Sequence, residues 1–465
     1  MNNTTIFRAN NYPVVIIISL SVILLTGFFI GSGFLKPTFL ILAGLIVAIV
    51  SAMGGPTFVL GILYPILHPI GQYPIVIEEI SISLERFVLI ICAFIFFGFI
   101  FNRNRKLPSL PKKILAPIFL WLVSSLVSGI FNQGSDWFVI FAFLQKLFFC
   151  WFVFLALSER NTLIKALNVY VITSFIASIF TVFLFFRSDT MNIIRNANFL
   201  SGESLSEGLL FGIARAGSGD MMAIWIALLF FKQNDNQNIK KTIWAGIAIW
   251  LVGVSMLSLR REYIIDIIIG IVFIVFYKPI QMRKQGAFIG LAMMVILSSV
   301  LLTSPEWQRR LFTETTLTVQ NQNDLRTLAL RRSITAFIQR PLLGYGPGSY
   351  EYVIPAQPGN DLISSREEFR AHNSFASVAV ETGLFGLVGL GIFLGVIAAD
   401  LYRKTMRQTP ALEQDFIPAF AMLFLLQILL SISFGNGLII NLIWFWIGIV
   451  VSIGFGKNSV LEKSR

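Results

Sequence analysis

The chain has 465 residues, of which 56% are hydrophobic and 13% charged, and its mean hydropathy is +0.78. Soluble domains are about 25% charged and lack serial apolar runs of membrane length, so this composition excludes an ordinary soluble protein and indicates a polytopic membrane protein. The net charge of +12 is expected to orient the chain and attract anionic lipid rather than bind nucleic acid.

Apolar segments follow one another along the chain and predict an all-α transmembrane helix bundle. They run over about 14–30, 37–52, 56–70, 86–101, 114–131, 138–157, 163–186, 221–231, 242–258, 263–277, 287–303, 373–399, 415–434 and 437–455. Several are shorter than the ~20 residues of a straight crossing, so we expect about 12–14 helices in a single integral membrane domain, residues 1–465. The first segment lacks a basic n-region and a cleavage site, and is expected to remain as an uncleaved helix.

The loops fall into two alternating sets that predict the orientation of the chain. Loops 103–113, 232–241, 278–286 and 402–407 and the C-terminal tail contain lysine, which predicts that they and both termini are cytoplasmic. Loops 187–220, 259–262 and 304–372 would then lie on the opposite, periplasmic side, and 304–372 is the one large external loop. These three loops contain arginine and no lysine: Arg187, Arg195, Arg215, Arg260, Arg261, Arg309, Arg310, Arg326, Arg331, Arg332, Arg340, Arg366 and Arg370.

The absence of lysine from the second set indicates a need for guanidinium groups rather than for positive charge alone. A guanidinium is planar, grips phosphate or carboxylate with two parallel hydrogen bonds, and stays ionised when partly desolvated. Arg215, Arg260 and Arg261 adjoin the ends of apolar segments, and Arg326, Arg331 and Arg332 cluster within the large loop. This pattern predicts a diphosphate held between helices at the outer leaflet; binding of phospholipid headgroups is the alternative.

Within the large loop, an amphipathic helix is predicted to follow Asp324 and to end near Pro341. Leu330, Ile334, Phe337 and Ile338 share one face of this helix at i, i+4, i+7 and i+8, and Arg332, Thr335 and Gln339 share another, with Arg331 beside them. This spacing is typical of a helix on the outer surface of the bilayer. Its polar face either lines a site or packs on the bundle.

After this helix, the sequence GYGPGSY places Gly344, Gly346 and Gly348 at alternate positions. Such glycines allow either an ordinary tight turn or backbone amides that approach an anion. His372 lies just before the next apolar segment and is followed by Asn373 and, within that segment, Glu381. A neutral histidine can take a proton from a hydroxyl, and a carboxylate inside a membrane segment is a candidate functional group. Glu381 would orient His372 or pair with Lys146 or another cation.

These motifs together are similar to a known family. The quoted elements are RAGSGD at 215–220, SLRRE at 258–262, PLLGYGPGSY at 341–350, and His372-Asn373 before ETGLFG at 381–386. Over about residues 200–400 the pattern resembles the O-antigen ligase and polymerase superfamily of bacterial membrane proteins. The element RRE stands where many members have Arg-Gly, which leaves open whether Arg260 or Arg261 is equivalent.

The resemblance implies a GT-C-like glycosyltransferase in the bacterial inner membrane. It would move a glycan from a polyprenyl (undecaprenyl) diphosphate carrier to an acceptor hydroxyl at the periplasmic face, as polymerase or ligase, with inversion and without a metal or other cofactor. His372 would be the base, and the arginines would hold the diphosphate. The implied partners are the lipid-linked donor, a glycan or glycolipid acceptor, membrane lipids and envelope polysaccharide assembly proteins. A transporter of an anion or lipid-linked glycan and a non-catalytic scaffold are the alternatives.

Overall fold

A computed structural model describes the greater part of the helical regions of the chain. The described residues are 59–67, 74–77, 80–83, 111–132, 135–185, 221–234, 237–256, 261–277, 280, 283–303, 325–356, 373–406, 416–434, 438 and 441–456. The expected helices at 14–30, 37–52 and 86–101 lie outside these residues. The chain divides into two compact units, one with residues 1–108, 152–215 and 456–465, and the other with residues 109–151 and 216–455.

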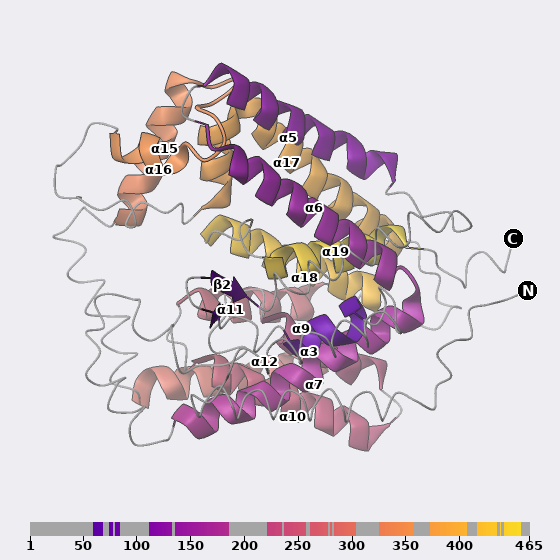
Figure 1. The fold of residues 1–465 in the computed structure, drawn as a ribbon. Helices are drawn as coiled ribbons and strands as arrows, with labels where there is room; N and C mark the ends of the chain where they lie inside the picture. Colours follow the sequence, from indigo (N-terminus) through magenta and orange to yellow (C-terminus); the bar gives the residue numbers. More distant parts are fainter. Residues whose placement is uncertain are drawn as a thin grey trace, which may run out of the picture. The chain divides into compact units, whose positions relative to one another are not determined.

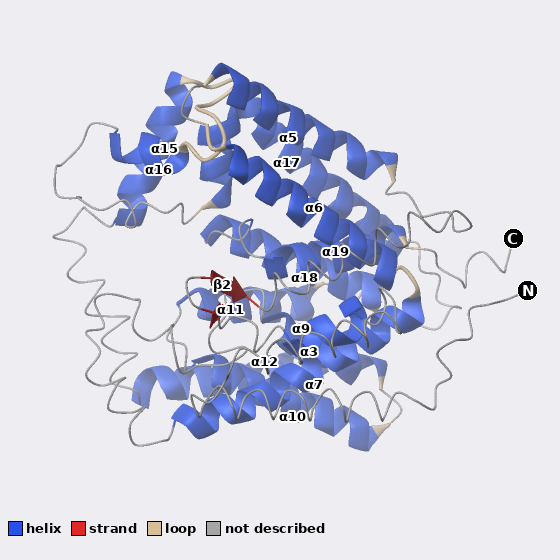
Figure 2. Ribbon diagram, in the orientation of Figure 1, coloured by secondary structure: helices blue, strands red, loops and turns tan. Residues whose placement is uncertain are grey.

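The first unit contains a long helix that packs against a short π-helical and α-helical segment. Helix α7 (Arg160–Phe185) contacts η2 (Val59–Leu63) and α3 (Tyr64–Leu67). Strands β1 (Pro74–Ile77) and β2 (Ile80–Ser83) form an antiparallel pair (Figure 2), with Ile77 opposite Ile80. The alternation of isoleucine and serine in β2 is typical of a strand, and this small hairpin is the one departure from the expected all-α fold among the described residues.

The second unit is a helix bundle in which α5 and α17 lie side by side (Figure 1). Helix α17 contacts α5, α15, α16, α18 and α19, while α18 also packs on α9 and α11, and α10 packs on α9 and α12. The helices are α5 (Lys112–Phe131), α6 (Trp137–Leu157, whose last residues belong to the first unit), α9 (Met222–Gln233), α10 (Asn238–Ser255), α11 (Arg261–Phe276), α12 (Arg283–Thr303), α15 (Leu325–Gln339), α16 (Tyr350–Ala356), α17 (Ser374–Met406), α18 (Ile417–Phe434) and α19 (Asn441–Phe455).

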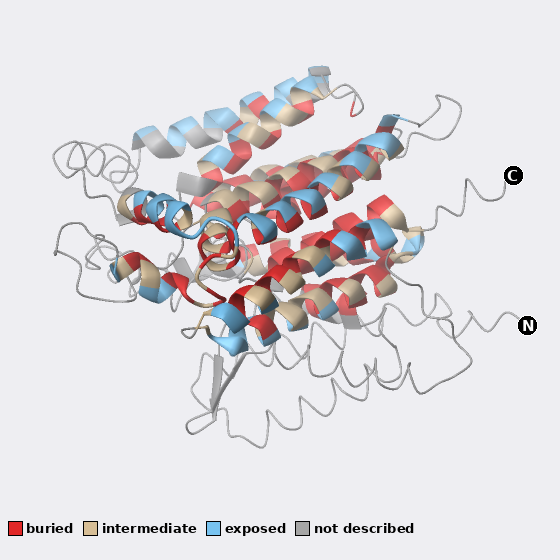
Figure 3. Cartoon of the chain, turned by 90° about the horizontal axis from the view of Figure 1, so that it is seen from above, coloured by how far each residue is buried: buried red, intermediate tan, exposed pale blue. Residues whose placement is uncertain are grey.

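The described helices confirm an all-α polytopic membrane protein. Four of them are long and apolar enough to cross a bilayer, namely Lys112–Phe131, Trp137–Leu157, Arg160–Ile179 and Ser374–Met406. Shorter apolar helices are also present, and buried and exposed residues alternate along the helices (Figure 3). Large apolar side chains such as Phe138, which is 81% exposed, stand on the outside of α6, as expected for surfaces solvated by lipid rather than by water.

Helix α17 is longer than a bilayer is thick and changes direction within its length. Its 33 residues would span roughly 50 Å as a straight helix, against about 30 Å for the hydrocarbon core. Gly383 interrupts it with φ 65° and ψ −159°. It also continues to Met406, so the loop expected at 402–407 is mostly helix, and the Arg403 guanidinium lies 3.4 Å from Asp400 in its last turns.

Beyond the kink, α5 and α17 approach each other closely. A Cβ atom at Gly389 would lie 2.9 Å from the backbone nitrogen of Trp121, so a larger residue would push the helices apart. Small residues at such contacts let transmembrane helices pack backbone against backbone. The α5–α17 pair therefore supports the segments that pack on α17, among them α15 and α16.

Helix α15 forms where the amphipathic pattern predicts it, but it buries the face with small and polar residues. Ala329, Ser333 and Ala336 are buried against α16 and α17, whereas Ile334 is 53% and Ile338 69% exposed. Small side chains allow the close approach, which leaves the larger apolar side chains outside. The structure thus agrees with a helix that packs on the bundle while turning an apolar stripe outward.

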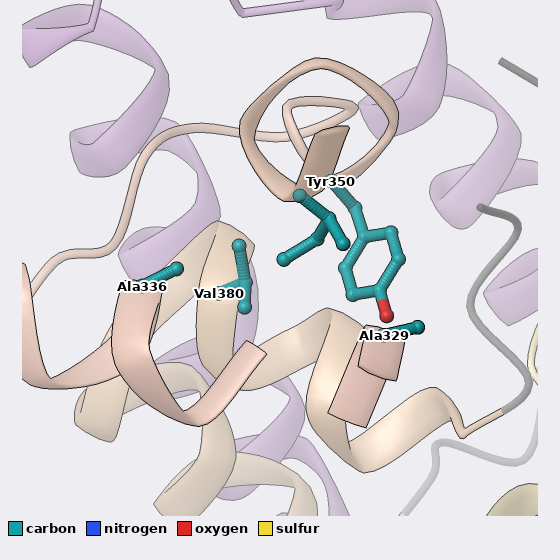
Figure 4. Close-up of a cluster of buried hydrophobic side chains, with 5 residues drawn as sticks. Ala329, Ala336, Tyr350 and Val380 are labelled. Carbon is teal, nitrogen blue, oxygen red and sulfur yellow. The ribbon is translucent and has the colours of Figure 1, made fainter. Parts of the chain in front are cut away.

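A small buried cluster joins α15, α16 and α17 (Figure 4). The Tyr350 ring lies among Ala329, Ala336 and Val380, and its hydroxyl is 2.9 Å from Ser333 Oγ. Burial raises the pKa of the Tyr350 hydroxyl above its usual value of 10.0, although the hydrogen bond with Ser333 opposes this. The hydroxyl therefore stays protonated at neutral pH and keeps this bond.

Candidate functional site

The glycine loop, residues 341–350, connects α15 to α16 and requires glycine at all three alternate positions. Gly344, Gly346 and Gly348 have φ angles of 68°, 101° and 75°, in the left-handed region that other residues seldom adopt. A Cβ atom at Gly344 would lie 2.5 Å from the Val380 carbonyl oxygen, and one at Gly346 would overlap the Ser135 hydroxyl. The glycine spacing thus serves both the turn geometry and close packing on α17 and on the connection between α5 and α6.

The glycine loop replaces the helical hydrogen bonds that α17 loses at its kink. In a regular helix, the amide of Leu384 would bond to the Val380 carbonyl. Here the Leu384 amide donates to the Pro341 carbonyl at 2.7 Å, and the Tyr345 amide donates to the Val380 carbonyl at 2.9 Å. The Gly346 amide donates to the Glu381 carbonyl at 2.9 Å. Loop and helix therefore satisfy each other's backbone groups and hold one another in place.

The side chain of Glu381 lies over the same loop. Its carboxylate accepts hydrogen bonds from the backbone amides of Gly348 and Tyr350 and from the Ser377 hydroxyl. These are the amides that the glycine pattern offers to an anion, and within the described structure the acceptor they meet is the carboxyl group of Glu381. The glycine loop is thus a supporting element that anchors the start of α17, and Glu381 takes its partners from this loop rather than from Lys146.

The end of α5 also contacts the glycine loop and Glu381. The Ser128 hydroxyl donates to the Glu381 carbonyl at 2.8 Å. The Asn132 side-chain amide donates to the Ser128 carbonyl at 2.7 Å and lies 3.4 Å from the Gly344 carbonyl. Because these partners are more than 200 residues apart in sequence, the contacts join α5 to the region from α15 to α17.

Asn373 caps the N-terminus of α17. Its side-chain oxygen accepts the amide hydrogen of Ala376 at 3.0 Å, and its carbonyl accepts that of Ser377 at 3.1 Å. Asparagine is a favoured N-cap because it satisfies amides that lack a helical partner. Through the capped helix and the glycine loop, the backbone at Asn373 is anchored to the bundle.

A comparison with family models identifies the region that contains these elements. Residues 246–391 match the model described as O-antigen ligase, and this segment includes α15, the glycine loop, Asn373 and Glu381. This segment, residues 246–391, is similar to O-antigen ligases, and it is named the O-antigen ligase domain for that similarity. The resemblance to the O-antigen ligase and polymerase superfamily is thereby confirmed, while no curated protein matches the chain.

The predicted arginines of the O-antigen ligase domain differ in their surroundings. Arg331 is exposed on α15, whereas Arg332 is buried and donates to the Ile354 carbonyl at 3.3 Å, which ties α16 to α15. The side chains of Arg261 and Arg326, at the starts of α11 and α15, lie outside the description, as do Arg215, Arg260 and His372. The structure thus brings Glu381 together with the three glycines, while Asn373 caps the same helix and Arg332 binds α16.

Sequence reasoning missed the contribution of α5 to this site. Ser128 and Asn132 lie before the matched segment, and they hold the O-antigen ligase domain at Glu381 and at Gly344. The only local signal is that Ser124, Ser128 and Asn132 recur every four residues, which puts polar groups on one face of an apolar helix. Only the tertiary structure shows that this face of α5 packs against α17.

Proposed function

We propose that this protein is a glycosyltransferase of the bacterial inner membrane that works at the periplasmic face. It would transfer a glycan from a polyprenyl (undecaprenyl) diphosphate carrier to an acceptor hydroxyl, as a polysaccharide polymerase or an O-antigen ligase. The observation that carries this proposal is the O-antigen ligase match over residues 246–391. The anchored start of α17 supports it, because Asn373 stands next to the proposed base, His372.

The proposed reaction is a single inverting displacement. The acceptor oxygen forms a bond to the anomeric carbon while the bond from that carbon to the diphosphate oxygen breaks, and the diphosphate leaves with both electrons. His372 takes the proton of the acceptor hydroxyl as the oxygen attacks. Arg215, Arg260 or Arg261, Arg326 and Arg331 would stabilise the growing negative charge on the diphosphate, where other enzymes use a metal ion. We assign Arg332 a positioning part, since its guanidinium already bonds to Ile354.

The contacts of Asn373 fix the residue that follows the proposed base. A proton acceptor has to lie within hydrogen-bond reach of the attacking hydroxyl, so its backbone needs firm support. Asn373, the next residue in the sequence, caps α17, and the Glu381 side chain anchors the same helix one turn beyond Ser377. Glu381 would therefore act through the placement of α17 rather than by touching the reacting atoms.

The decisive experiment compares the two histidines of the chain. Purified protein in nanodiscs is supplied with a polyprenyl-diphosphate-linked oligosaccharide without added metal, and glycan transfer is followed by gel mobility. His372→Ala should abolish transfer, while His68→Ala, which removes the other histidine, should retain it. Normal transfer by His372→Ala with a wild-type melting temperature would exclude the catalytic assignment.

The acceptor requirement separates the two kinds of enzyme. A ladder of products without a second acceptor would identify a polymerase, and a single product that needs a glycolipid acceptor would identify a ligase. Arg215→Lys should also impair transfer, because lysine keeps the charge but loses the planar fork. Donor binding without transfer to any acceptor would favour the transporter.

A further inference from the structure

Arg340 carries a guanidinium group that is held from two sides at the end of α15. Its Nη1 atom donates a hydrogen bond to Asn132 Oδ1. The guanidinium carbon also lies 4.6 Å from the centre of the Tyr345 ring, in a cation–π contact. The side chain is exposed, so it is oriented without being enclosed.

Both groups that hold Arg340 are themselves fixed by the glycine loop and its neighbours. The Asn132 amide nitrogen donates to the Ser128 carbonyl, which leaves Asn132 Oδ1 directed at Arg340. The Tyr345 hydroxyl donates to Gln339 Oε1 at 2.7 Å, while the Tyr345 backbone is bonded to α17. An exposed arginine ordinarily loses side-chain entropy when it binds an anion, and here part of that ordering has already taken place.

The positive charge of Arg340 is not matched within the described part of the chain. Its contacts there are with a neutral amide oxygen and a neutral aromatic ring. The nearby carboxylates have other donors, since Glu381 binds the amides of the glycine loop and Asp136 accepts the Phe138 amide at 2.9 Å. An oriented arginine with free donors, and with no carboxylate partner among the residues that the structure describes, is suited to bind an external anion.

The surroundings of Arg340 are those of a membrane interface. On its own segment, Ile338 is 69% and Leu342 56% exposed. Across from it, where the transmembrane helix α5 ends, Phe131 is 74% exposed, and Trp137 begins α6. Exposed apolar and aromatic residues at the end of a membrane helix lie at the depth of lipid headgroups. The anion available there in quantity is phosphate attached to a lipid.

We propose that Arg340, oriented by Asn132 and Tyr345, binds a lipid-borne phosphate at this end of the bundle. Two sources share that chemistry, namely a bulk anionic phospholipid and the diphosphate of the glycan carrier. The second source rests on the proposed function and would make Arg340 a further donor-binding residue. The binding of phosphate itself does not depend on that function.

The test measures binding of two phosphate lipids to full-length protein in zwitterionic nanodiscs. One arm titrates undecaprenyl diphosphate, and the other measures retention of phosphatidylglycerol by native mass spectrometry. Arg340→Ala and Arg340→Gln should weaken binding about tenfold or more, as expected for loss of charge-assisted hydrogen bonds, and Arg340→Lys should weaken it less. Arg403→Ala is the matched control, because Arg403 is also exposed but lies at the opposite end of α17 beside Asp400.

Weakening confined to undecaprenyl diphosphate would support the carrier as the ligand, and weakening confined to phosphatidylglycerol would support a bulk-lipid site. Unchanged affinity in both arms, with folded variants, would overturn the proposal. Because Arg340→Gln can still bond to Asn132, it keeps the test valid if Arg340→Ala does not fold. Glycan transfer by the wild type, combined with unchanged lipid binding by the Arg340 variants, would overturn this inference alone. No glycan transfer by the wild type, combined with impaired phosphate binding by the Arg340 variants, would overturn the proposed function alone.

Discussion

Replacing Gly383 with alanine should destabilise the protein far more than the same change at Gly391 or Gly395 of α17. Gly383 has φ 65° and ψ −159°, a combination that is essentially restricted to glycine and costs other residues about 1–3 kcal/mol. A Cβ atom there would also lie 2.7 Å from the Leu343 backbone nitrogen and overlap the Leu342 carbonyl. Because these are backbone atoms held by the hydrogen bond from Leu384 to Pro341, they cannot move aside cheaply.

The two costs add to a sizeable loss of stability. Overpacking a tight contact adds about 1–3 kcal/mol, so Gly383→Ala should cost about 2–6 kcal/mol in total. At about 2–4 °C per kcal/mol, the melting temperature should fall by roughly 5–20 °C. Glycan transfer should fall with it, since the kink sets the position of the start of α17.

The assay is a thermal melt of detergent-purified protein, followed by a thiol-independent fluorescence signal. Gly391→Ala and Gly395→Ala are controls on the same helix, because a Cβ atom at either position meets nothing within 4 Å. Alanine is the better helix former by about 1 kcal/mol, so these controls should melt at or slightly above the wild-type temperature. A Gly383→Ala protein that melts with the controls would refute the kinked geometry and the clamp built on it.

Three further outcomes are expected from the same region. Glu381→Leu should lower stability by about 2–4 kcal/mol, because the amides of Gly348 and Tyr350 and the Ser377 hydroxyl would lose their acceptor, whereas Glu351→Leu at an exposed position of α16 should change the melting temperature little. Tyr350→Phe should cost about 1 kcal/mol through loss of the bond to Ser333. Burial raises the folded-state pKa of Tyr350 above 10.0. The difference in melting temperature between wild type and Tyr350→Phe should therefore keep its whole size below pH 10.0 and disappear as the pH rises through the folded-state pKa. A difference that varies between about pH 7 and 9 would contradict this. A tryptophan in place of exposed Ile334 should be quenched by brominated lipid more strongly than one in place of Thr335, and equal quenching would show that the apolar stripe of α15 does not face lipid.

Much of the helical architecture could be read from the sequence because it depends on local composition. The apolar segment at 114–131 became α5, Lys112–Phe131, and the segment at 138–157 became α6, Trp137–Leu157. The end of α15 before Pro341 followed from the rigid proline ring, and the positive φ angles of the glycine loop followed from the spacing of its glycines. Each of these depends on neighbours within a few residues.

Local composition does not decide which residues are catalytic. The resemblance that names His372, Arg215 and Arg260 is confirmed at the level of the domain by the match at residues 246–391, and their roles stay predictions. The pairing of Asn132 with Arg340 across 208 positions had no signal in either segment alone. Arg340 differs from the other arginines of the lysine-free loops in its contacts with Asn132 and Tyr345, and those contacts are visible only in the structure.

By itself, the sequence determined that this is a polytopic helical membrane protein, where many of its helices begin and end, and that its O-antigen ligase domain contains a glycine-rich turn. Those properties arise from hydrophobic periodicity and from backbone preferences that act over one or two helical turns. Only the tertiary structure decided that α15 buries Ala329 and Ala336 rather than Ile334 and Ile338. It also decided that Glu381 fills the amide-lined turn of the glycine loop. Which face is buried and which acceptor meets an amide depend on the segments that pack there, and those segments come from distant parts of the chain.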